Sequence, residues 1–550
     1  MISRRAALGL GAAGLLGGCT PVGTPPGAGA EASRGIDVAA RVASAQLRRH
    51  IDQAPRTLDP ATSVDVPSQR ILDDLFEGLV RLDAAGQVVP AVAQRWTRSA
   101  DGLEWVFELD PAARWSDGTP VTSEDFVYGW RRTLDPRTAS QSAQMLAPID
   151  GALAVAAGQA PASRLAAEAL GPQRLRVRLA EQTPFFLYLL TNQYLFPQPR
   201  GAIEQHGEGW TRPGNMVSNG AFTLQDLRIN GAVQALRNPR YREATAVRLR
   251  QISYFPVADR GAATARFLAG DVDLTDGFNT EDIDWLRRDL GDQVQLAPYF
   301  GTVMLAFNTR RPPFDSPELR LALSMTLDRD ILTGKLLRGL FLPATHLVPP
   351  YPGYEPALPE WAGWPEARRL AMARELYAKA GYSPDRPLRA EMAVQHTSPD
   401  TRRLMEAMIA MWRQHLGAEL RLVGEEWRVF QQNRRLGKHG LYWNAWIGDY
   451  PDPLTFLTLY QAGNGQNHGG YSSPAYETAL AAAARSEDDG QRLQRLTQAE
   501  AVLNEEAPFL PVYFYQSRHL LRPYVRGWQG NVMDRHLSRD LWLAEPGAGG

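Results

Sequence analysis

The chain has 550 residues, more than one hydrophobic core normally supports, so two or three domains are expected. With 44% apolar and 22% charged residues and a net charge of −1, nothing in the composition favours nucleic acid or an anionic membrane surface as a partner. The single cysteine, Cys19, excludes an internal disulfide and any metal site built from several cysteines.

The first eighteen residues have the pattern of an export signal. Arg4-Arg5 forms a short basic region, and the apolar stretch 6–18 that follows is too short to span a bilayer, which needs about 20 residues. The paired arginines are similar to a twin-arginine signal, although Ala7 stands where an aromatic residue is usual. We therefore predict that residues 1–18 are a signal peptide, exported by a Tat-like or Sec route.

Cys19 stands where a lipid-bearing cysteine is expected. Leu16-Gly17-Gly18-Cys19 is similar to a lipobox, in which cleavage leaves the cysteine as the first residue of the mature chain. The alternative is an ordinary secretory signal with a chance cysteine. Residues 20–35 are rich in Pro, Gly and Ala and cannot pack. We predict a lipid anchor and flexible tether over 19–44, and a membrane-anchored lipoprotein of the periplasm or cell envelope.

Beyond residue 45 the sequence alternates between short apolar runs, which predict strands, and longer periodic runs, which predict helices. The predicted strands are 103–109, 174–179, 249–255, 303–307, 419–423, 441–446 and 510–515. The predicted helices are 124–134, 319–328, 366–380 and 402–416. The fold class is therefore α/β or α+β with mixed sheets.

Capping residues mark the ends of these helices. Thr122 lies three residues before Asp125 and predicts a capping box. Ser316-Pro317 supplies a cap and a proline at the first helical position. Gly381 and Gly417 follow two other helices and suit the left-handed position that ends a helix.

The sequence contains no recognisable catalytic constellation. The nine histidines are scattered, and no HExxH, GxSxG, P-loop or strand-linked GxGxxG pattern occurs. No cysteine remains in the mature domain to act as a nucleophile. We therefore predict a protein that is not an enzyme, with no catalytic residues, no resident metal and no cofactor; catalysis by residues distant in sequence stays open.

Aromatic residues crowd the stretch 427–460, which includes Trp427. In the predicted strand 441–446, alternation places Tyr442, Asn444 and Trp446 on one face and Leu441, Trp443 and Ala445 on the other. If one face is core, the other carries large rings near an acid. Aromatic walls with a few polar groups are what a small-ligand cleft needs.

That acid belongs to the segment Gly448-Asp449-Tyr450-Pro451-Asp452-Pro453. Asp452 followed by proline is read as the cap of a helix over 454–460. Asp449 has no such role and directly follows the strand that carries Trp446. A carboxylate in an apolar pocket needs a cation. That cation is either the ammonium group of a ligand or an Arg or Lys of the protein, and the pattern alone leaves both open.

Blocks spread along most of the chain resemble the peptide-binding solute-binding proteins of bacterial ABC importers, the extracellular solute-binding protein family 5. The most specific is RWSDGTPVTSEDF at 114–126. The others, in the same order as in the family, are 55–60, 74–79, 218–222, 238–241, 307–308, 320–329, 446–453 and 470–472.

The resemblance implies a two-lobed periplasmic-binding-protein-like fold with three domains, the first of them discontinuous. Domain I is expected over 45–76, 204–302 and 517–545, domain II over 77–203 and domain III over 303–516. The lobes would close over a short peptide and deliver it to ABC permease subunits in the cytoplasmic membrane. The protein is expected to be a monomer, with membrane contact only through the lipid on Cys19.

The resemblance also implies roles for single residues. Asp449 would hold the α-amino group of the peptide, and Trp427 and Trp446 would line side-chain pockets. The segment Val64-Asp65-Val66 is expected as a strand that offers backbone groups to the peptide.

Two positions depart from the family pattern. Trp443, which we also count among the candidate ligand-binding residues, stands where some relatives carry an Arg that helps to bind the peptide carboxylate. Residues 141–145 replace tyrosines of some relatives. How the carboxylate is bound and which peptide length is preferred therefore stay open.

Two alternatives remain. The same fold can bind a dipeptide, a murein peptide or a metal chelate, although Asp449 disfavours ligands without an amine. The scaffold can also serve a peptide-handling enzyme or chaperone, which no nucleophile–base pair in the sequence supports.

Overall fold

The computed structural model describes residues 37–228, 231–396, 399–486 and 488–545. The predicted export signal, Cys19 and the tether up to residue 36 lie outside the described residues. The last part of the predicted tether is helix α2, Val38–Ser44, where the Asp37 side chain accepts a hydrogen bond from the Ala40 N–H and so caps the first turn. No helix in the described ranges is both long and apolar enough to cross a membrane.

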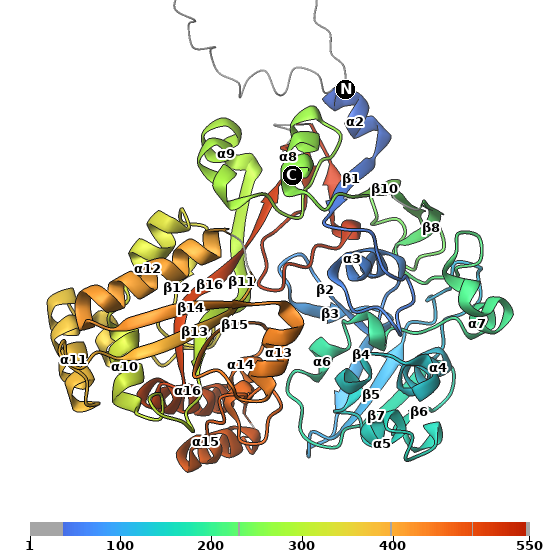
Figure 1. Cartoon of the computed structure of the whole chain (residues 1–550). Helices are drawn as coiled ribbons and strands as arrows, with labels where there is room; N and C mark the ends of the chain where they lie inside the picture. Colours follow the sequence, from blue (N-terminus) through green and yellow to red (C-terminus); the bar gives the residue numbers. More distant parts are fainter. Residues whose placement is uncertain (1–36, 229–230, 397–398, 487, 546–550) are drawn as a thin grey trace, which may run out of the picture.

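The molecule has two lobes (Figure 1). The first lobe, residues 37–293 and 521–545, contains two four-stranded sheets, with strand orders β1-β10-β9-β8 and β4-β5-β7-β6. β1 runs parallel to β10, and the remaining pairs in both sheets are antiparallel. The strands are β1 Gln46–Ile51, β4 Ala93–Arg98, β5 Glu104–Leu109, β6 Ala167–Ala169, β7 Arg174–Arg178, β8 Phe222–Leu227, β9 Val233–Arg237 and β10 Gln251–Pro256.

The helices of the first lobe cover these sheets. Its principal helices are α3 Val66–Leu75, α4 Ser123–Leu134, α5 Ala152–Ala156, α6 Phe186–Leu189, α7 Arg200–His206, α8 Arg260–Ala269 and α9 Ile283–Leu290. A small hairpin pairs β2, Val80–Leu82, with β3, Val88–Pro90, and another joins β17, Val525–Arg526, to β18, Trp542–Leu543.

The second lobe, residues 308–508, is built on a six-stranded mixed sheet of order β12-β16-β11-β15-β13-β14. Its own strands are β12 Leu342–Pro343, β13 Arg389–Gln395, β14 Glu419–Glu425 and β15 Leu441–Ile447. Its helices are α10 Pro317–Met325, α11 Glu366–Lys379, α12 Pro399–Leu416, α13 Trp427–Arg435, α14 Leu454–Leu457, α15 Pro474–Ala484 and α16 Asp489–Glu506.

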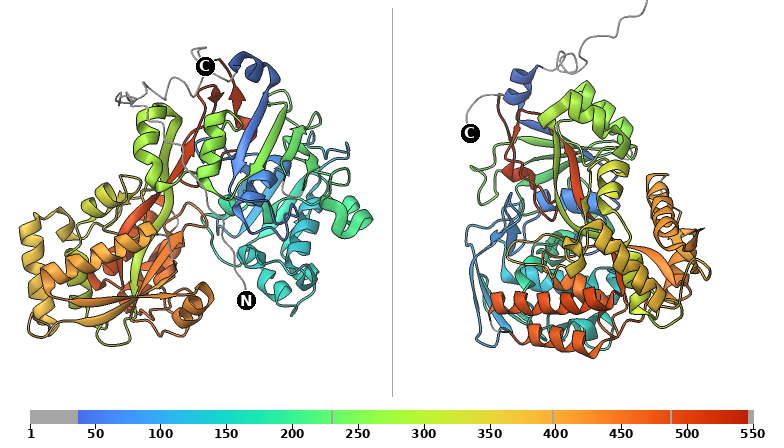
Figure 2. Two further views of the ribbon diagram at one scale, coloured as in Figure 1. Left: turned by 45° about the horizontal axis from the view of Figure 1, so that its top comes forward. Right: turned by 90° about the vertical axis from the view of Figure 1, so that its left-hand side faces the viewer.

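Two long strands connect the lobes. β11, Val294–Phe307, and β16, Phe509–Leu520, pair antiparallel along most of their length and run from one lobe into the other (Figures 1 and 2). The predicted domain boundaries at 302/303 and 516/517 fall inside these strands. The chain therefore passes between the lobes within a hydrogen-bonded ribbon. The three-domain division itself remains a proposal.

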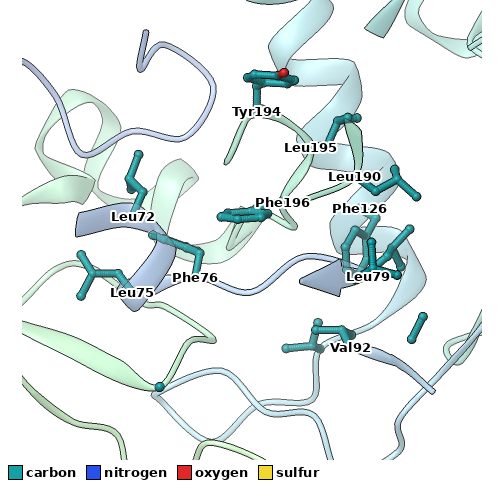
Figure 3. Close-up of a cluster of buried hydrophobic side chains, with 14 of the residues drawn as sticks. Leu72, Leu75, Phe76, Leu79, Val92, Phe126, Leu190, Tyr194, Leu195 and Phe196 are labelled. Atoms are coloured by element: carbon teal, nitrogen blue, oxygen red, sulfur yellow. The ribbon is translucent and has the colours of Figure 1, made fainter. Parts of the chain in front are cut away.

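The largest hydrophobic cluster joins residues of the predicted domains I and II. α3 and the loop after it meet α4 and the segment 190–196 in this cluster (Figure 3). The side chains labelled in Figure 3 are Leu72, Leu75, Phe76, Leu79, Val92, Phe126, Leu190, Tyr194, Leu195 and Phe196. Because both predicted domains bury side chains in the same cluster, they form one lobe. Separate clusters fill the second lobe.

The predicted elements agree with the structure except at their ends. The capping box of Thr122 and Asp125 is formed, and Ser316 accepts the Leu319 N–H at the start of α10. α10 ends at Met325, before the predicted 328, and a π-helical turn over Ile331–Leu336 follows. β11 and β16 are much longer than the predicted strands 303–307 and 510–515, because each continues through the connection between the lobes.

Polar residues of the recognised sequence blocks are anchors inside the lobes. The Arg320 guanidinium donates from Nε to the Ala507 carbonyl oxygen at 2.8 Å and from Nη1 to that of Phe314 at 2.7 Å. Asn219 exchanges two hydrogen bonds with the backbone of Glu77. These residues satisfy buried backbone groups, so they maintain the fold and do not face a ligand.

Candidate functional site

A cavity of about 540 Å³ lies between the two lobes. One wall comes from the loop and first turn of α3, which expose Val64 and Val66, and from the segment 141–145. The opposite wall comes from Ile447, Gly448 and Asp449 at the end of β15. The other side chains that line it are Gln69, Arg70, Asp73, Tyr188, Asn192, Gln193, Tyr194, Tyr299, Met533, Asp534, Arg535 and His536.

The backbone that carries Asp449 is fixed to the second lobe. The Gly448 N–H donates to the Phe300 carbonyl oxygen at 2.7 Å, and the Asp449 N–H donates to Thr455 Oγ1 at 3.1 Å. A Cβ atom on Gly448 would lie 2.6 Å from Phe300 Cδ1 and 2.9 Å from Thr455 Cγ2. Only glycine fits here, and this close approach sets the position of the residue that follows.

The Asp449 carboxylate opens into the cavity without a protein partner. Within the described residues it makes no hydrogen bond and no ion pair, although solvent reaches it. Asp449 keeps its contact with solvent, but the surrounding walls remove part of its hydration, and this desolvation raises the pKa of Asp449 to about 6. Of the two cations left open by the sequence, a protein Arg or Lys is not found in the described part of the chain. A ligand ammonium group fits the site.

The neighbouring Asp452, unlike Asp449, has protein partners for its carboxylate. It is buried and pairs with Arg492, whose Nη2 lies 2.5 Å from Asp452 Oδ2. Its Oδ1 also accepts the Leu454 N–H at 3.0 Å at the start of α14. The N-cap residue of α14 is Pro453, one position later than the predicted Asp452. Two acids of one short loop thus divide into a structural anion and a free one.

The segment Val64-Asp65-Val66 is not a strand, and this prediction is wrong. α3 begins at Val66, and the Asp65 side chain caps it by accepting the Ser68 N–H at 2.9 Å. Asp65 therefore serves the helix. Val64 still lines the cavity, and in the described residues its backbone N–H and C=O make no hydrogen bond. The unpaired backbone that the resemblance implied is present without the strand.

A second cavity of about 220 Å³ lies under α13, beside the strand β15. α13 is at the edge of the second lobe nearest the first (Figure 1). Both predicted pocket tryptophans line this cavity: Trp427, half of whose surface is exposed, and Trp446, whose Nε1 donates to Thr455 Oγ1 at 3.2 Å. The other rings around it are Phe307, Phe430, Tyr442, Trp443, Tyr460, Tyr471 and Tyr515.

Trp443 contributes to the hydrophobic core of the second lobe. It is 8% exposed, lies opposite Leu305 in β11 and contacts the ring of Tyr513. It borders the cavity under α13 but not the cavity of Asp449. An arginine at this position would be largely buried, and Trp443 supplies no charge for a carboxylate.

The cavity under α13 contains a guanidinium group that the sequence reasoning missed. Arg434 Nη1 donates to Asn444 Oδ1 at 3.0 Å and Nη2 to Gln431 Oε1 at 2.7 Å. Its Nε is buried without an acceptor, and no carboxylate pairs with the group in the part of the chain that the structure describes. Burial lowers the pKa of Arg434. A partly buried cation without an anion can bind an anionic group of a ligand.

The C-terminal segment 531–538 is a further part of the site that was missed. Met533, Asp534, Arg535 and His536 line the cavity of Asp449. Arg535 is bound by Asp73, with Nη2 2.6 Å from Oδ1. No periodicity or motif marks this segment, and it reaches the site only because β16 carries the chain back into the first lobe.

His519, Asp534 and His536 lie close enough together to suggest a metal site. His519 Nε2 faces Asp534 Oδ1 at 2.6 Å, and Nδ1 faces the Thr275 carbonyl oxygen at 2.7 Å. Both partners are acceptors, so both ring nitrogens carry protons. Burial disfavours the imidazolium, but the charge of Asp534 outweighs this and raises the pKa of His519. The cluster is therefore an ion-pair network, and it offers no free His519 nitrogen to a metal.

The chain is similar to known proteins in both sequence and structure. Residues 87–468 match the family model described as bacterial extracellular solute-binding proteins, family 5. The chain is 35% identical over 504 residues to the periplasmic murein peptide-binding protein MppA of Escherichia coli, which covers 91% of this chain and 93% of MppA. It is 35% identical over 517 residues to the periplasmic oligopeptide-binding protein OppA of the same organism, covering 92% and 95% of the two chains.

Two further similarities bear on the ligand and on the conformation. The probable deoxycholate-binding periplasmic protein YgiS of Escherichia coli is 35% identical over 493 residues, covering 89% of this chain and 92% of YgiS. Among solved structures, the unliganded open form of MppA superposes with a TM-score of 0.84 at 35% identity, covering 91% of this chain and 97% of that one.

Proposed function

Because the chain belongs to family 5 of the bacterial extracellular solute-binding proteins, we propose that it captures short peptides between its lobes and delivers them to an ABC permease. The observation that carries this proposal is the Asp449 carboxylate, which faces the cavity with no cation beside it in the described residues. A peptide brings the missing cation in its α-ammonium group.

The charges of the two groups match over a defined pH range. Asp449 is ionised above pH 6, since its pKa is about 6. The α-ammonium of a peptide keeps its charge up to a pKa of about 8. Between these limits an ion pair forms in a cleft that closure shields from water, where the attraction is stronger than in bulk solvent. N-acetylation removes the cation and leaves the rest of the peptide unchanged.

The peptide main chain has its own partner across the cavity. Val64 has an N–H and a C=O without a hydrogen bond among the described residues, next to the exposed side chain of Val66. An extended peptide can form main-chain hydrogen bonds with this backbone, and these bonds do not depend on the side chains of the peptide. The aromatic cavity under α13 then receives one side chain of the peptide. Because main-chain and side-chain contacts are made in separate places, this arrangement supports binding of peptides that differ in sequence.

Calorimetric titration of the mature protein with a tripeptide and with its N-acetylated form tests the proposal. The free peptide is expected to bind and the acetylated one to bind far more weakly. Asp449→Asn is expected to weaken binding of the free peptide by about 2–5 kcal/mol. It should hardly change binding of the acetylated peptide. Asp385→Asn, an exposed acid outside the cleft, is the matched control. Equal binding of both peptides by wild type and Asp449→Asn would show that Asp449 does not hold the amine.

Arg434 favours a second, narrower ligand class, peptides with an additional carboxylate. A guanidinium group that no carboxylate pairs with among the described residues, in an aromatic cavity, is suited to an acidic group. Murein peptides belong to this class together with ordinary acidic peptides. Ala-Glu-Ala is expected to bind more tightly than Ala-Gln-Ala, and Arg434→Met should abolish the difference. Equal affinities of the two peptides for wild type exclude this class. Tight binding of deoxycholate with no peptide binding would instead favour a ligand without an amine.

We propose that the bound peptide is released unchanged. No nucleophile–base pair was found in the sequence, and relatives of the family are named as binding proteins. Prolonged incubation of peptide with excess protein, followed by chromatography, should return intact peptide. Cleavage that a single substitution in the cleft abolishes would establish an enzyme instead.

Attachment to a membrane through Cys19 is also a proposal, and it concerns residues outside the described ranges. A lipid on Cys19 would keep a monomeric binding protein at the membrane that holds its permease. Cell fractionation should find the full-length protein with membranes and Cys19→Ala in the soluble extract. Equal distribution of the two proteins would favour the ordinary secretory signal.

Sedimentation of the mature domain tests the monomeric state.

A further inference from the structure

One aromatic stack joins the two lobes away from the connecting strands. The ring of Tyr450, in the loop after β15, lies on the ring of Phe185, just before α6 of the first lobe. Their centroids are 3.7 Å apart and their planes differ by 3°. Tyr450 is the one residue of the second lobe that packs against the large cluster of the first lobe, within the residues described. A side chain of the second lobe is thus part of the packing of the first.

Tyr450 directly follows Asp449, and the stack acts on a loop that is otherwise held only from its own lobe. Gly448 and Asp449 are bound through their N–H groups to Phe300 and Thr455, and Asp452 is bound to Arg492. All of these partners lie in β11 or in the second lobe. Phe185 contacts the middle of the loop from the opposite side.

The rings lie nearly face to face, without the offset that gives the strongest aromatic pairs. Their attraction therefore comes mainly from ring area removed from water. Both rings are half-buried, and no hydrogen bond of the Tyr450 hydroxyl accompanies the stack in the described residues. The contact is strong enough to orient a short loop and too weak to dominate the stability of either lobe.

We propose that Phe185 is a positioning residue for the amino-terminal subsite: by holding Tyr450 from the first lobe, it fixes the direction in which Asp449 presents its carboxylate to the peptide. This inference rests on the proposed function of Asp449. It assigns to the first lobe a part in binding the α-amino group, although the carboxylate itself belongs to the second. Without Phe185 the loop keeps its anchors but loses the contact that fixes the Asp449–Tyr450 pair across the cleft.

The test measures binding of a free tripeptide and its N-acetylated form to Phe185→Ala, Phe185→Tyr and wild type. Phe185→Ala is expected to weaken the free peptide about 3- to 10-fold, the range typical for one aromatic pair, and to leave the acetylated peptide unchanged. Phe185→Tyr keeps the ring and should bind as wild type does. In an Asp449→Asn background, Phe185→Ala should cause no further loss, since both changes act on one interaction.

Trp96→Ala is the matched control. Trp96 is a half-buried ring of the first lobe that packs against the same cluster but does not line the cavity. It should leave both affinities unchanged. An equal loss for both peptides in Phe185→Ala, or a loss that adds to that of Asp449→Asn, overturns the positioning role in favour of a general effect on the lobes.

A second measurement does not depend on any ligand. Hydrogen exchange of the Asp449 and Asp452 amides in the unliganded protein should be faster in Phe185→Ala than in wild type, and unchanged in Phe185→Tyr. Unchanged exchange in Phe185→Ala would overturn the proposal. If wild type fails to distinguish the free from the acetylated peptide, the proposed role of Asp449 fails, and amide exchange still decides whether Phe185 holds the loop.

Discussion

Glu500 and Asp449 both belong to the second lobe, and desolvation raises the pKa of each, but the protein surrounds them differently. Glu500 is fully buried and accepts hydrogen bonds from the N–H groups of Leu347, Val348 and Ala357 and from the Tyr354 hydroxyl, at 2.7 to 3.2 Å. Asp449 lies in an open cavity and accepts none within the described residues.

The difference separates a structural carboxylate from the one proposed to bind the ligand. Four donors converge on Glu500 and tie the segment 347–357 to α16, so its charge is compensated in the unliganded protein. The carboxylate of Asp449 is exposed to solvent and has no hydrogen-bond donor or cation among the described residues, so the ammonium group of a ligand can pair with it. Hydrogen-bond donors around a carboxylate are therefore more informative about its role than its pKa, which shifts upward in both cases.

The largest effect is expected from Glu500→Ala. It leaves three N–H groups and one hydroxyl without their acceptor and opens a cavity, so the second lobe should lose about 4–5 kcal/mol of unfolding free energy. Urea denaturation followed by tryptophan fluorescence measures the loss. Glu505→Ala, an exposed acid of the same helix, is the control and should change little. If the two variants had similar urea midpoints, Glu500 would not have the structural role that distinguishes it from Asp449.

Arg492→Met should have the next largest effect. It leaves the buried Asp452 without its cation, and removing one partner of a buried ion pair costs about 3 kcal/mol or more. Because Asp452 anchors the loop of Asp449, peptide affinity should fall as well. Thermal unfolding and titration with a tripeptide measure the two losses. Arg495→Met, on the exposed side of α16, should leave both unchanged.

The pH dependence of binding sharpens the same comparison. Since the pKa of Asp449 in the free protein is about 6, peptide affinity should be full above pH 6 and fall as pH drops below it. The fall approaches tenfold, about 1.4 kcal/mol, for each pH unit. Above a pH of about 8 the peptide amine loses its proton and affinity should fall again. Calorimetry from about pH 4.5 to about pH 9 covers the titration of both groups and measures how peptide affinity depends on pH. An acid limb that persists in Asp449→Asn would assign the titration to another group.

The smallest effect is expected from Asp449→Asn on the unliganded protein. No hydrogen bond or ion pair of the carboxylate is lost among the described residues, so the unfolding free energy should change by no more than about 0.5 kcal/mol. Thermal unfolding without peptide measures it, next to the large loss from Glu500→Ala. A destabilisation of several kcal/mol would mean that Asp449 has a structural partner.

The sequence was sufficient for everything that depends on local chemistry. The alternation of apolar residues predicted β15, and the capping residues Thr122 and Ser316 predicted the starts of α4 and α10. Asp449 was found because it follows a strand and has no capping role. The order of the sequence blocks indicated the family, which the comparisons confirm.

The tertiary structure decided what depends on segments far apart in the chain. Val64 to Val66 was predicted as a strand, but Asp65 caps α3 through a hydrogen bond to Ser68. Arg434 had no sequence signal, because the absence of a carboxylate partner among the described residues is a property of its surroundings. The wall formed by 533–536 and the stack of Phe185 on Tyr450 join residues hundreds of positions apart.

The sequence by itself thus determined the family, the principal helices and strands and the one acid that the loop does not use. Local periodicity and capping suffice for these, because they involve neighbouring residues. Only the folded chain decided which charges are compensated, since a carboxylate is free or satisfied according to the donors and cations that distant segments bring to it. For Asp449 those segments bring walls, a supporting ring and two arginines, Arg70 and Arg535, that already pair with other carboxylates. No cation pairs with Asp449 among the described residues, and this leaves the site open to the ammonium group of a ligand.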